Sequence, residues 1–261
     1  MFMNGTYITT SLDELKVNIP AFEVVEAGDF TTIQDFPARV GKWNAGIPPS
    51  GPLDSYSFRM ANRLLENEEH AAGLEFSSGL VIIFHHDAYI AITGAFVDLH
   101  INDVRAEVGR PLKVVAGQNI RLDTLNSGKT AYISVKGGIQ VPEIFGSRST
   151  FMMGKIGGHC GRALRSGDII PIHNNAAQAP REFKIVPPSI FGNKWHLRVL
   201  PGPHAFPDFL SKSSYNELFQ SSWKVHHNSN RVGIRLLGPK PKWAREGGAA
   251  GLHPSNLHDS P

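Results

Sequence analysis

Short apolar runs, bounded by turn-forming residues, recur along the chain from residue 22 onward. Each run spans only three to five residues, and Gly, Asn and Asp stand between the runs. Runs this short, with turn residues around them, are typical of strands rather than helices. The clearest runs are 22–25, 80–84, 88–92, 97–101, 112–115, 120–122 and 131–135. The sequence therefore predicts a mostly β fold, arranged as a barrel or a sandwich.

Helical patterns are confined to two stretches, 54–65 and, more weakly, 207–220. Asp54 can cap the first helix, because its side-chain oxygens accept hydrogen bonds from the free amide groups of the first turn. Asn102 and Asp103 stand between two apolar runs and predict a hairpin turn. We therefore expect few helices beside the strands.

The chain divides by composition into several parts. Residues 1–21 are separate from the strand-like region, and the segment 174–188, rich in Ala and Pro, predicts a linker. We expect a first β module at 22–173 and a second at 189–261. Within the second module, strand-like runs are found at 195–200, 222–225 and 233–237.

The composition is that of a soluble globular protein, with 41% hydrophobic and 19% charged residues. No apolar run approaches the roughly 20 residues needed to cross a bilayer, and the N-terminus lacks the features of a signal peptide. The one cysteine, Cys160, cannot form an internal disulfide, which fits a reducing compartment. We therefore expect a cytoplasmic protein that does not bind membranes. We interpret Cys160 as a buried or half-buried residue rather than a nucleophile, because no third group that would orient the adjacent His159 can be identified.

The formal charge of +3 hides an imbalance between the two halves of the chain. Residues 1–130 hold 10 Lys and Arg against 16 Asp and Glu, whereas residues 131–261 hold 16 against 7. The basic residues are scattered and are not clustered with stacking aromatics, so nucleic-acid binding is not expected. The basic half would instead meet anionic substrates or an acidic partner domain, with an ordinary solvated surface as the alternative.

The segment 46–54 combines three prolines and two glycines in nine residues. Proline fixes φ and glycine admits conformations closed to other residues, so the segment predicts a stiff loop. The loop ends at the N-terminus of a predicted helix, where free amide groups and the helix dipole favour an anion or a carbonyl oxygen. We predict that Pro49, Ser50, Gly51 and Asp54 shape a substrate pocket, largely through backbone groups. The alternative is a structural turn that leads into a packed helix.

Four further residues are candidates for contact with a substrate. Arg59 and Asn62 are three residues apart on one helical face and could donate to a carboxylate or carbonyl, or could equally anchor the loop. The block 154–162 places His159 and Arg162 among glycines, which allow close backbone approach. A titratable group beside a fixed cation makes these two residues catalytic candidates, with a structural glycine turn as the alternative.

Four blocks in a fixed order carry a family resemblance. They are 31–37 with 41–43, the loop at 46–54, the glycine-rich block at 154–162, and 238–245 with 253–256. Together they resemble the carboxyltransferase region of biotin-dependent urea carboxylase, which is the carboxylase part of fungal urea amidolyase. Within that region, the resemblance is to the first half, the domain called allophanate hydrolase subunit 2. Residues 5–13 resemble the end of the biotin carboxylase domain that precedes it.

The resemblance implies two cyclophilin-like β-barrel modules, of which the second is incomplete at its C-terminus. It also implies that the intact assembly moves a carboxyl group from N1 of carboxybiotin to a urea nitrogen, giving allophanate. Biotin would be attached to a separate carrier domain. The other partners would be the biotin carboxylase domain and a second carboxyltransferase half. We accordingly expect the isolated chain to be inactive and, because a β-barrel without its closing strands exposes an unpaired edge, prone to aggregation.

The same resemblance assigns site residues near the C-terminus. Arg245 and His253 are catalytic candidates, and Ser255 and Asn256 are candidates for substrate binding. The sequence departs here from the family pattern, in which an acidic element separates the Arg from the His-Pro-Ser-Asn block. Ala249 stands where an acid is expected, which puts a role for that carboxylate in doubt.

Two other functions within the same domain family stay open. The chain is also similar to one of the subunits of bacterial 5-oxoprolinase, and to relatives that act as non-catalytic interaction subunits. No metal site is expected, because neither 85–87 nor 226–227 has the three or four ligands of a standard site, and neighbours on a strand point to opposite faces. No biotinylation motif and no P-loop are present, so we do not expect this chain to carry biotin or bind ATP itself.

Overall fold

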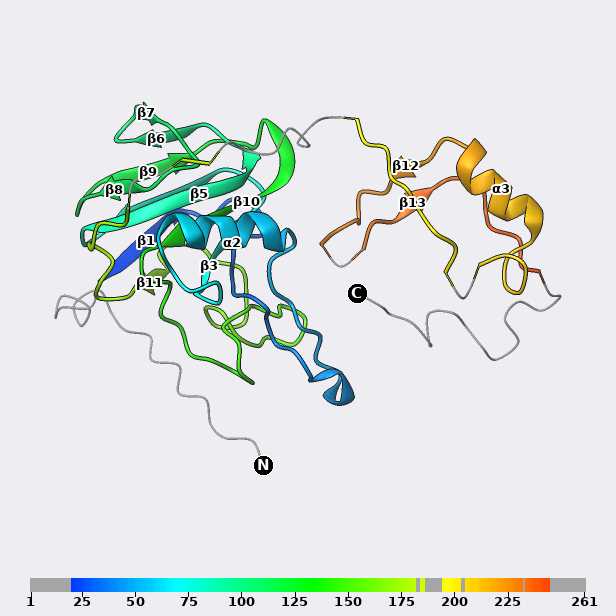
Figure 1. The fold of residues 1–261 in the computed structure, drawn as a ribbon, viewed down its shortest axis with the longest axis horizontal. Helices are drawn as coiled ribbons and strands as arrows, with labels where there is room; N and C mark the ends of the chain where they lie inside the picture. Colours follow the sequence, from blue (N-terminus) through cyan, green and yellow to red (C-terminus); the bar gives the residue numbers. More distant parts are fainter. Residues whose placement is uncertain (1–19, 182–183, 186–193, 203–204, 232, 245–261) are drawn as a thin grey trace. The chain divides into compact units, whose positions relative to one another are not determined.

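The computed structural model describes residues 20–181, 184–185, 194–202, 205–231 and 233–244. They belong to two compact units, which divide between residues 194 and 195. Strands predominate among the described residues (Figure 1), and the helices are α2 (Ser55–Leu64), α3 (Lys212–Gln220) and the short 3-10 helix η1 (Trp43–Ala45). The expected mostly β fold is therefore confirmed.

The first unit contains two antiparallel sheets. One has six strands in the order β11-β1-β4-β9-β6-β7, and the other has five in the order β2-β3-β10-β5-β8. The strands of the six-stranded sheet are β1 (Ala21–Glu26), β4 (Leu80–Phe84), β6 (Leu99–Ile101), β7 (Val104–Ala106), β9 (Asn119–Leu122) and β11 (Ile169–Pro171). Those of the five-stranded sheet are β2 (Thr32–Gln34), β3 (Gly73–Phe76), β5 (Ala88–Phe96), β8 (Leu112–Val114) and β10 (Ser127–Val135). A bridge between Ile139 and Ile172 joins the segments that follow β10 and β11, at one corner of the two sheets.

One apolar core fills the space between the two sheets. Phe22 and Phe84 of the six-stranded sheet lie fully buried in it, with ring centroids 5.5 Å apart, together with Ile133 of the other sheet. Because side chains alternate along a strand, Tyr132 points to the opposite face, where its ring meets Phe58 of α2 edge-on at 5.8 Å. Helix α2 thus covers the outer face of the five-stranded sheet, against β5 and β10 (Figure 1). Burial of side chains this large contributes about 1.5–3 kcal/mol each.

Local sequence signals in the first unit are confirmed. Each apolar run predicted as a strand in this unit overlaps an observed strand. The predicted hairpin turn lies at Asn102 and Asp103, whose φ values of 48° and 65° fit a tight turn between β6 and β7. Asp54 caps α2, since its Oδ1 accepts a hydrogen bond from the Ser57 amide at 3.0 Å. The described part of the segment 174–188 packs on this unit, where Ala176 O accepts from the Tyr89 amide at 2.7 Å.

The described residues of the second unit form α3, the two-stranded ribbon of β12 (Lys224–Val225) and β13 (Leu236–Leu237), and a bridge between Leu210 and Trp243. The strand predicted at 195–200 is wrong, because these residues form no regular structure and Leu200 is 92% exposed. Among the described residues of this unit, only Ser214 is buried. The division into barrel modules and the closure of each barrel stay predictions. No helix in the described ranges is long and apolar enough to span a bilayer.

Candidate functional site

The loop at 46–54 is held by side chains of the five-stranded sheet beneath it. Gln34, at the end of β2, accepts a hydrogen bond from the Gly51 amide through Oε1 at 3.0 Å. Glu75, on the neighbouring strand β3, accepts from the Leu53 amide through Oε2 at 2.7 Å. Both acceptors are buried, so these two amides point into the protein and not toward solvent.

Tyr132 continues this row of acceptors on the next strand, β10. Its hydroxyl accepts from the Asp54 amide at 2.7 Å and donates to Glu75 Oε2 at 3.2 Å. Burial and the adjacent Glu75 carboxylate both raise the pKa of Tyr132, so the hydroxyl keeps its proton at neutral pH. Three neighbouring strands therefore fix the backbone of the loop.

The N-terminus of α2 is occupied by its own cap. The Asp54 carboxylate accepts from both the amide and the hydroxyl of Ser57. The amides of Gly51, Leu53, Asp54 and Ser57 thus all have acceptors within the chain. The expectation of free amide groups that receive an anion is wrong at these four positions, because acidic and polar side chains of the sheet and the cap reach them first.

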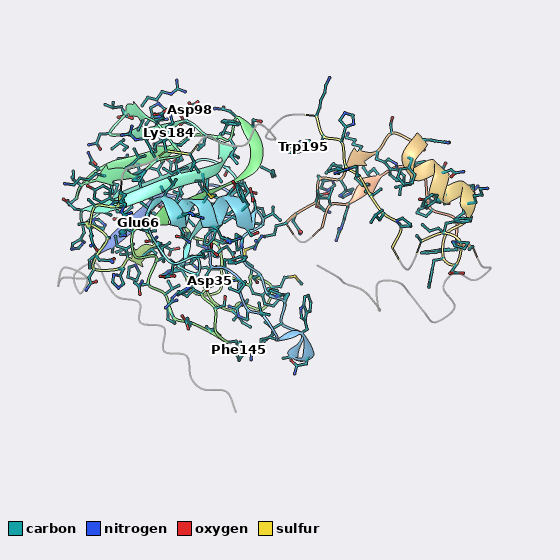
Figure 2. The ribbon with its side chains drawn as sticks, viewed as in Figure 1. Asp35, Glu66, Asp98, Phe145, Lys184 and Trp195 are labelled. Atoms are coloured by element: carbon teal, nitrogen blue, oxygen red, sulfur yellow. The ribbon has the colours of Figure 1, made fainter. Side chains whose placement is uncertain are left out.

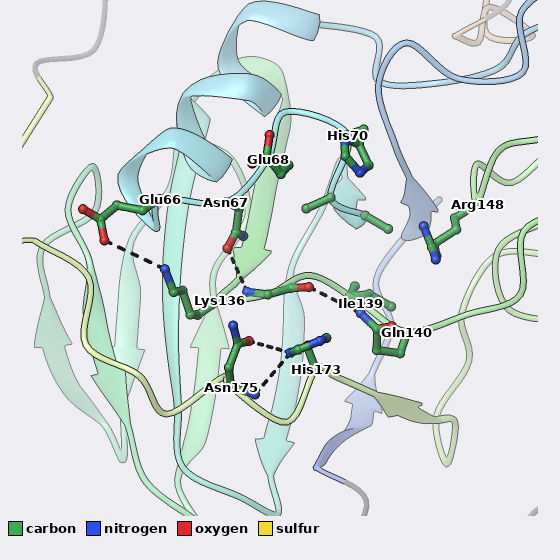
Figure 3. Close-up of a pocket in the computed structure, with 13 residues that line it drawn as sticks. Glu66, Asn67, Glu68, His70, Lys136, Ile139, Gln140, Arg148, His173 and Asn175 are labelled. Carbon is green, nitrogen blue, oxygen red and sulfur yellow. Dashed lines mark hydrogen bonds and ion pairs between the residues drawn. The ribbon is translucent and has the colours of Figure 1, made fainter.

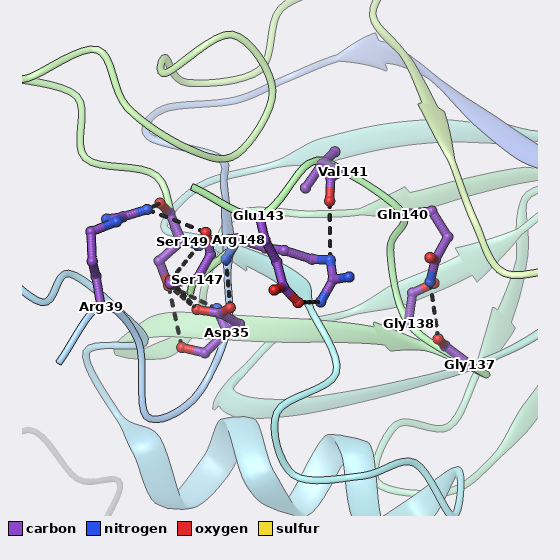
Figure 4. A network of polar contacts seen from close by, with 10 residues as sticks. All are labelled: Asp35, Arg39, Gly137, Gly138, Gln140, Val141, Glu143, Ser147, Arg148 and Ser149. Atoms are coloured by element: carbon purple, nitrogen blue, oxygen red, sulfur yellow. Dashed lines mark hydrogen bonds and ion pairs between the residues drawn. The ribbon is translucent and has the colours of Figure 1, made fainter. Parts of the chain in front are cut away.

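A buried carboxylate ties the end of β2 to a distant loop (Figures 2 and 4). Asp35 is 6% exposed, and its Oδ1 accepts from the hydroxyls of Ser147 and Ser149 at 2.6 and 2.5 Å. Its Oδ2 accepts from the Arg148 amide at 2.6 Å. One side chain therefore holds three consecutive residues that lie 112 to 114 positions away in sequence.

Arg39 strengthens the same junction (Figure 4). Its guanidinium is fully buried and donates to the carbonyl oxygens of Ile144 and Ser149 at 2.9 and 2.8 Å. Burial lowers the pKa of Arg39, and the charge of Asp35 opposes this effect. The Arg39 amide also donates to Pro49 O at 3.0 Å. The Gly158 amide donates to Arg148 O at 2.8 Å, so the junction also contacts the glycine-rich block at 154–162. The structure thus brings the blocks at 31–37, 46–54 and 154–162 together in the first unit.

The two catalytic candidates of the glycine-rich block meet one carboxylate. Arg162 donates to both oxygens of Asp168, with two N–O distances of 2.7 Å. His159 Nε2 lies 3.3 Å from Asp168 Oδ1. The Asp168 side chain is only 10% exposed and also accepts from the Arg165 amide at 2.8 Å. Asp168 is therefore the common anchor of His159 and Arg162.

The electrostatics of this cluster favour a neutral imidazole beside a permanent cation. Burial lowers the pKa of His159, and the charge of Arg162 adds to this effect, while Asp168 opposes it. Burial alone would raise the pKa of Asp168, but hydrogen bonds from Arg162 and the Arg165 amide, with the nearby charges, hold it below its ordinary value. Asp168 is thus charged at neutral pH and orients a ring whose Nδ1 has no partner among the described residues. That nitrogen can accept a proton.

We expect the His159→Gln variant to lose part of the pH dependence of stability between about pH 7.5 and 5.5. The folded-state pKa of His159 lies below its ordinary value of 6.5, so the unfolded chain takes up the proton first as the pH falls. This group therefore stabilises the wild-type fold above pH 6.5, and that contribution decreases below it. Urea unfolding at the two pH values measures the change.

The control for this experiment is His85→Gln, which removes a half-exposed histidine that lies 3.2 Å from Glu23. The loss of stability of this variant on acidification is the reference against which that of His159→Gln is compared. If wild type and His159→Gln lose the same stability on acidification, the assignment of a lowered pKa to His159 is incorrect.

The two helical candidates already have partners within the chain. Arg59 forms a bidentate pair with Glu69, with N–O distances of 2.9 Å, and lies over the Phe36 ring at 4.9 Å. Asn62 is fully buried, and its Nδ2 donates to Ala71 O at 2.9 Å. Asn62 therefore anchors the segment after α2, and is not free to contact a substrate.

Several other candidates are placed differently or lie elsewhere. Arg245, His253, Ser255 and Asn256 fall outside the described residues. Cys160 lies in the glycine-rich turn with a φ of 57° and is exposed, so its interpretation as a buried or half-buried residue is wrong.

The paired histidines do not behave as neighbours on a strand. The rings of His226 and His227 stack at 4.1 Å, because these residues follow β12 and lie in a turn. The expectation that they point to opposite faces is therefore wrong. In the part of the chain that the structure describes, no group of three His, Cys, Asp or Glu residues could hold a metal ion.

Sequence reasoning missed the acidic anchors of the site. Asp35, Glu75 and Asp168 each hold backbone or cationic groups, yet none lies in a motif that marks it as an anchor. Asp168 could have been found from its position, because it lies six residues after Arg162, close enough for a loop to bring the two side chains together. Asp35 lies in the block 31–37, but nothing in that block indicates which distant residues it holds, and Glu75 lies in none of the blocks.

Comparison with known proteins identifies the family. Residues 45–261 match the family model described as carboxyltransferase domain, subdomain A and B. The chain belongs to this carboxyltransferase-domain family. Its expected resemblance to the carboxyltransferase region of urea carboxylase and urea amidolyase is thereby confirmed.

Relatives in sequence and structure support the assignment. The urea amidolyase of Lachancea kluyveri is 43% identical over 272 residues, which cover 99% of this chain and 15% of that protein. The solved structure of Kluyveromyces lactis urea carboxylase is 40% identical, with a TM-score of 0.77 over 91% of this chain and 22% of that one. A 5-oxoprolinase subunit of Escherichia coli K12 is 36% identical over 83% of this chain and 68% of its own length. The chain thus spans only about 15% of the urea amidolyases that it matches.

Proposed function

We propose that this chain is part of the carboxyltransferase of a urea carboxylase, which moves a carboxyl group from carboxybiotin to urea and forms allophanate. The observation that carries the proposal is the similarity to K. lactis urea carboxylase over 91% of this chain. Carboxybiotin would reach the site on a separate carrier domain, and a biotin carboxylase domain and a second carboxyltransferase half would complete the assembly. We place this assembly in the cytoplasm.

The chemistry of the cluster around Asp168 fits this reaction. When bound, carboxybiotin would supply the carboxyl group. A urea nitrogen would form the new N–C bond and lose a proton, while the bond between the carboxyl carbon and N1 of biotin would break and leave N1 with the electron pair and a proton. His159, neutral and oriented through Nε2 by Asp168, would take the urea proton at Nδ1. Arg162, fixed by the same carboxylate, would face the ureido or carboxylate oxygen where negative charge develops.

The loop at 46–54 would shape the substrate pocket through its surface, because the amides of Gly51, Leu53 and Asp54 already have acceptors within the chain. Its backbone is fixed from the sheet side, so Pro49 and Ser50 present their outer surface to a bound substrate. Arg245, His253, Ser255 and Asn256 remain proposed contributions from the second module. Rigid support of this kind is what positions reacting groups for transfer.

A chimeric enzyme tests the proposal. The matching segment of Saccharomyces cerevisiae urea amidolyase, which is 40% identical over 99% of this chain, would be replaced by this chain, and allophanate formation from urea, bicarbonate and ATP would be measured. We expect the chimera to be active and the His159→Gln version to lose about 100-fold in rate, as removal of a general base does. His85→Gln is the matched control.

The proposal fails if the chimera folds and carboxylates its biotin yet forms no allophanate. Biotin carboxylation is measured as bicarbonate-dependent ATP hydrolysis. This measurement shows whether the assembly is intact, independently of the transfer step. Full activity of the His159→Gln chimera would leave the transferase assignment in place but remove His159 from the mechanism.

A second candidate is a role like that of the bacterial 5-oxoprolinase subunit. The observation that favours it is the 36% identity to the E. coli subunit over 83% of this chain. Replacement of the bacterial subunit by this chain would then support ATP-dependent cleavage of 5-oxoproline. Activity in that assay, with none in the urea amidolyase chimera, would favour the second candidate.

A further inference from the structure

A pocket of about 320 Å³ lies in the first unit, outside the residues assigned to carboxyl transfer (Figure 3). The segment after α2, residues 66–72, faces residues 173–175 across the turn that follows β10, and Arg148 closes one side. This volume is at the small end of the range for sites that bind small molecules.

Two glycines form the turn beside this pocket. Gly137 and Gly138 both have positive φ values, 78° and 82°. A Cβ on Gly137 would lie 2.0 Å from Asn175 Oδ1, and one on Gly138 would lie 3.1 Å from the Ala71 Cβ. The backbone of the turn therefore approaches both walls closely, which side chains at these positions would prevent.

His173 and Arg148 each have one nitrogen atom that makes no hydrogen bond within the described residues. His173 Nδ1 accepts a hydrogen bond from the Asn175 amide at 3.2 Å and lies 2.7 Å from the Asn175 side chain. With Nδ1 as the acceptor, the proton of the neutral ring is on Nε2, and Nε2 has no partner among the described residues. Arg148 Nε donates to Val141 O at 3.0 Å, and its Nη1 pairs with Glu143 at 2.6 Å. Within the described ranges Arg148 Nη2 has no acceptor. Both side chains are thus fixed by one end and can bind through the other.

A buried ammonium group adds positive charge to the same wall. The Lys136 side chain is 9% exposed, and its Nζ donates to Leu65 O at 2.7 Å, with Glu66 at 3.9 Å. An ammonium group has three donors and no acceptor, so further hydrogen bonds are available to a ligand. The carboxylates of Glu66 and Glu68 belong to exposed residues at the rim. Lys136 is therefore the buried charged residue among those that line the pocket, and it is a donor.

We propose that this pocket binds a small organic molecule through a carboxylate, with Arg148 Nη2 and His173 Nε2 as its direct contacts and Lys136 as a nearby positive charge. Guanidinium and imidazole donors around an uncharged glycine turn suit a carboxylate, because charge-assisted hydrogen bonds are the strong ones. The inference goes beyond the proposed carboxyl transfer, since none of these residues belongs to the cluster around Asp168.

Isothermal titration calorimetry of the full chain with malonate tests this inference, with malonamide as an uncharged probe of similar size. We expect one malonate per chain, and an affinity about tenfold or more lower in Arg148→Gln and in His173→Gln, as loss of a hydrogen bond to a charged group predicts. Malonamide should bind at least about tenfold more weakly than malonate. Arg105→Gln, which removes an arginine paired with Asp98 at 2.5 Å outside the pocket, should leave the affinity unchanged.

The inference is overturned if wild type does not bind malonate, or if both pocket variants bind it as tightly as wild type. Thermal melting followed by circular dichroism shows whether each variant is folded. If Arg148→Gln does not fold, the His173→Gln measurement decides the question. The titration involves no urea carboxylation, so failure of this inference is distinguishable from failure of the proposed function.

Discussion

Replacement of Asp35 by alanine should lower the free energy of unfolding by about 3–5 kcal/mol, the range found when a buried charge loses its partner. Three donors, the hydroxyls of Ser147 and Ser149 and the Arg148 amide, would lose their acceptor in a buried site. Arg39 would keep its charge while fully buried, without the carboxylate that compensates it. Urea unfolding at neutral pH, followed by fluorescence or circular dichroism, measures the loss.

Two further variants separate this effect from a general loss of charge. Asp98→Ala removes a half-exposed carboxylate that is paired with the exposed Arg105, and it should cause a much smaller loss because solvent screens such a pair. Asp35→Asn keeps one acceptor oxygen but turns an amide group toward donors, so it should lie between wild type and Asp35→Ala. If Asp35→Ala is no less stable than Asp98→Ala, the junction does not contribute as described.

The strands and α2 could be predicted because their signals are local. The runs that form β4 and β5 are apolar and bounded by turn residues, and Asp54 stands where a cap is needed. The run at 195–200 carries the same local pattern but forms no strand, and Leu200 is almost fully exposed. A strand needs a neighbour with which to pair, and an isolated apolar run does not supply one.

The site could be predicted only in part, because its anchors act across long distances in sequence. His159 and Arg162 stand out as a histidine and an arginine among glycines, but their orientation depends on Asp168. The loop at 46–54 is recognisable from its prolines, whereas Glu75 reaches Leu53 of this loop from 22 residues away. Asp35 reaches its partners across more than 110 residues. Such contacts follow from strand order and register, which a single sequence does not specify.

Gly157→Ala should destabilise the first unit by about 2–5 kcal/mol, the sum expected from a left-handed backbone and an overfilled site. Gly157 has a φ of 68°, and a Cβ there would lie 2.1 Å from Ser149 O and 2.6 Å from Arg39 Nη2. The backbone carbonyl cannot move freely, because Arg39 already donates to it at 2.8 Å. The methyl group would therefore push apart the junction that Asp35 and Arg39 hold.

Gly167→Ala is the matched control, because Gly167 has a φ of 85° but no atom within 4 Å of an added Cβ. It should cost only the strain of the left-handed backbone, about 1–2 kcal/mol. The difference between the two variants, measured by urea unfolding, isolates the steric part. Equal losses would show that the glycine-rich block needs Gly157 for backbone conformation alone. A larger loss at Gly157 would mean that close packing against Ser149 and Arg39 requires glycine there, and the orientation of His159 two residues later should then depend on that contact.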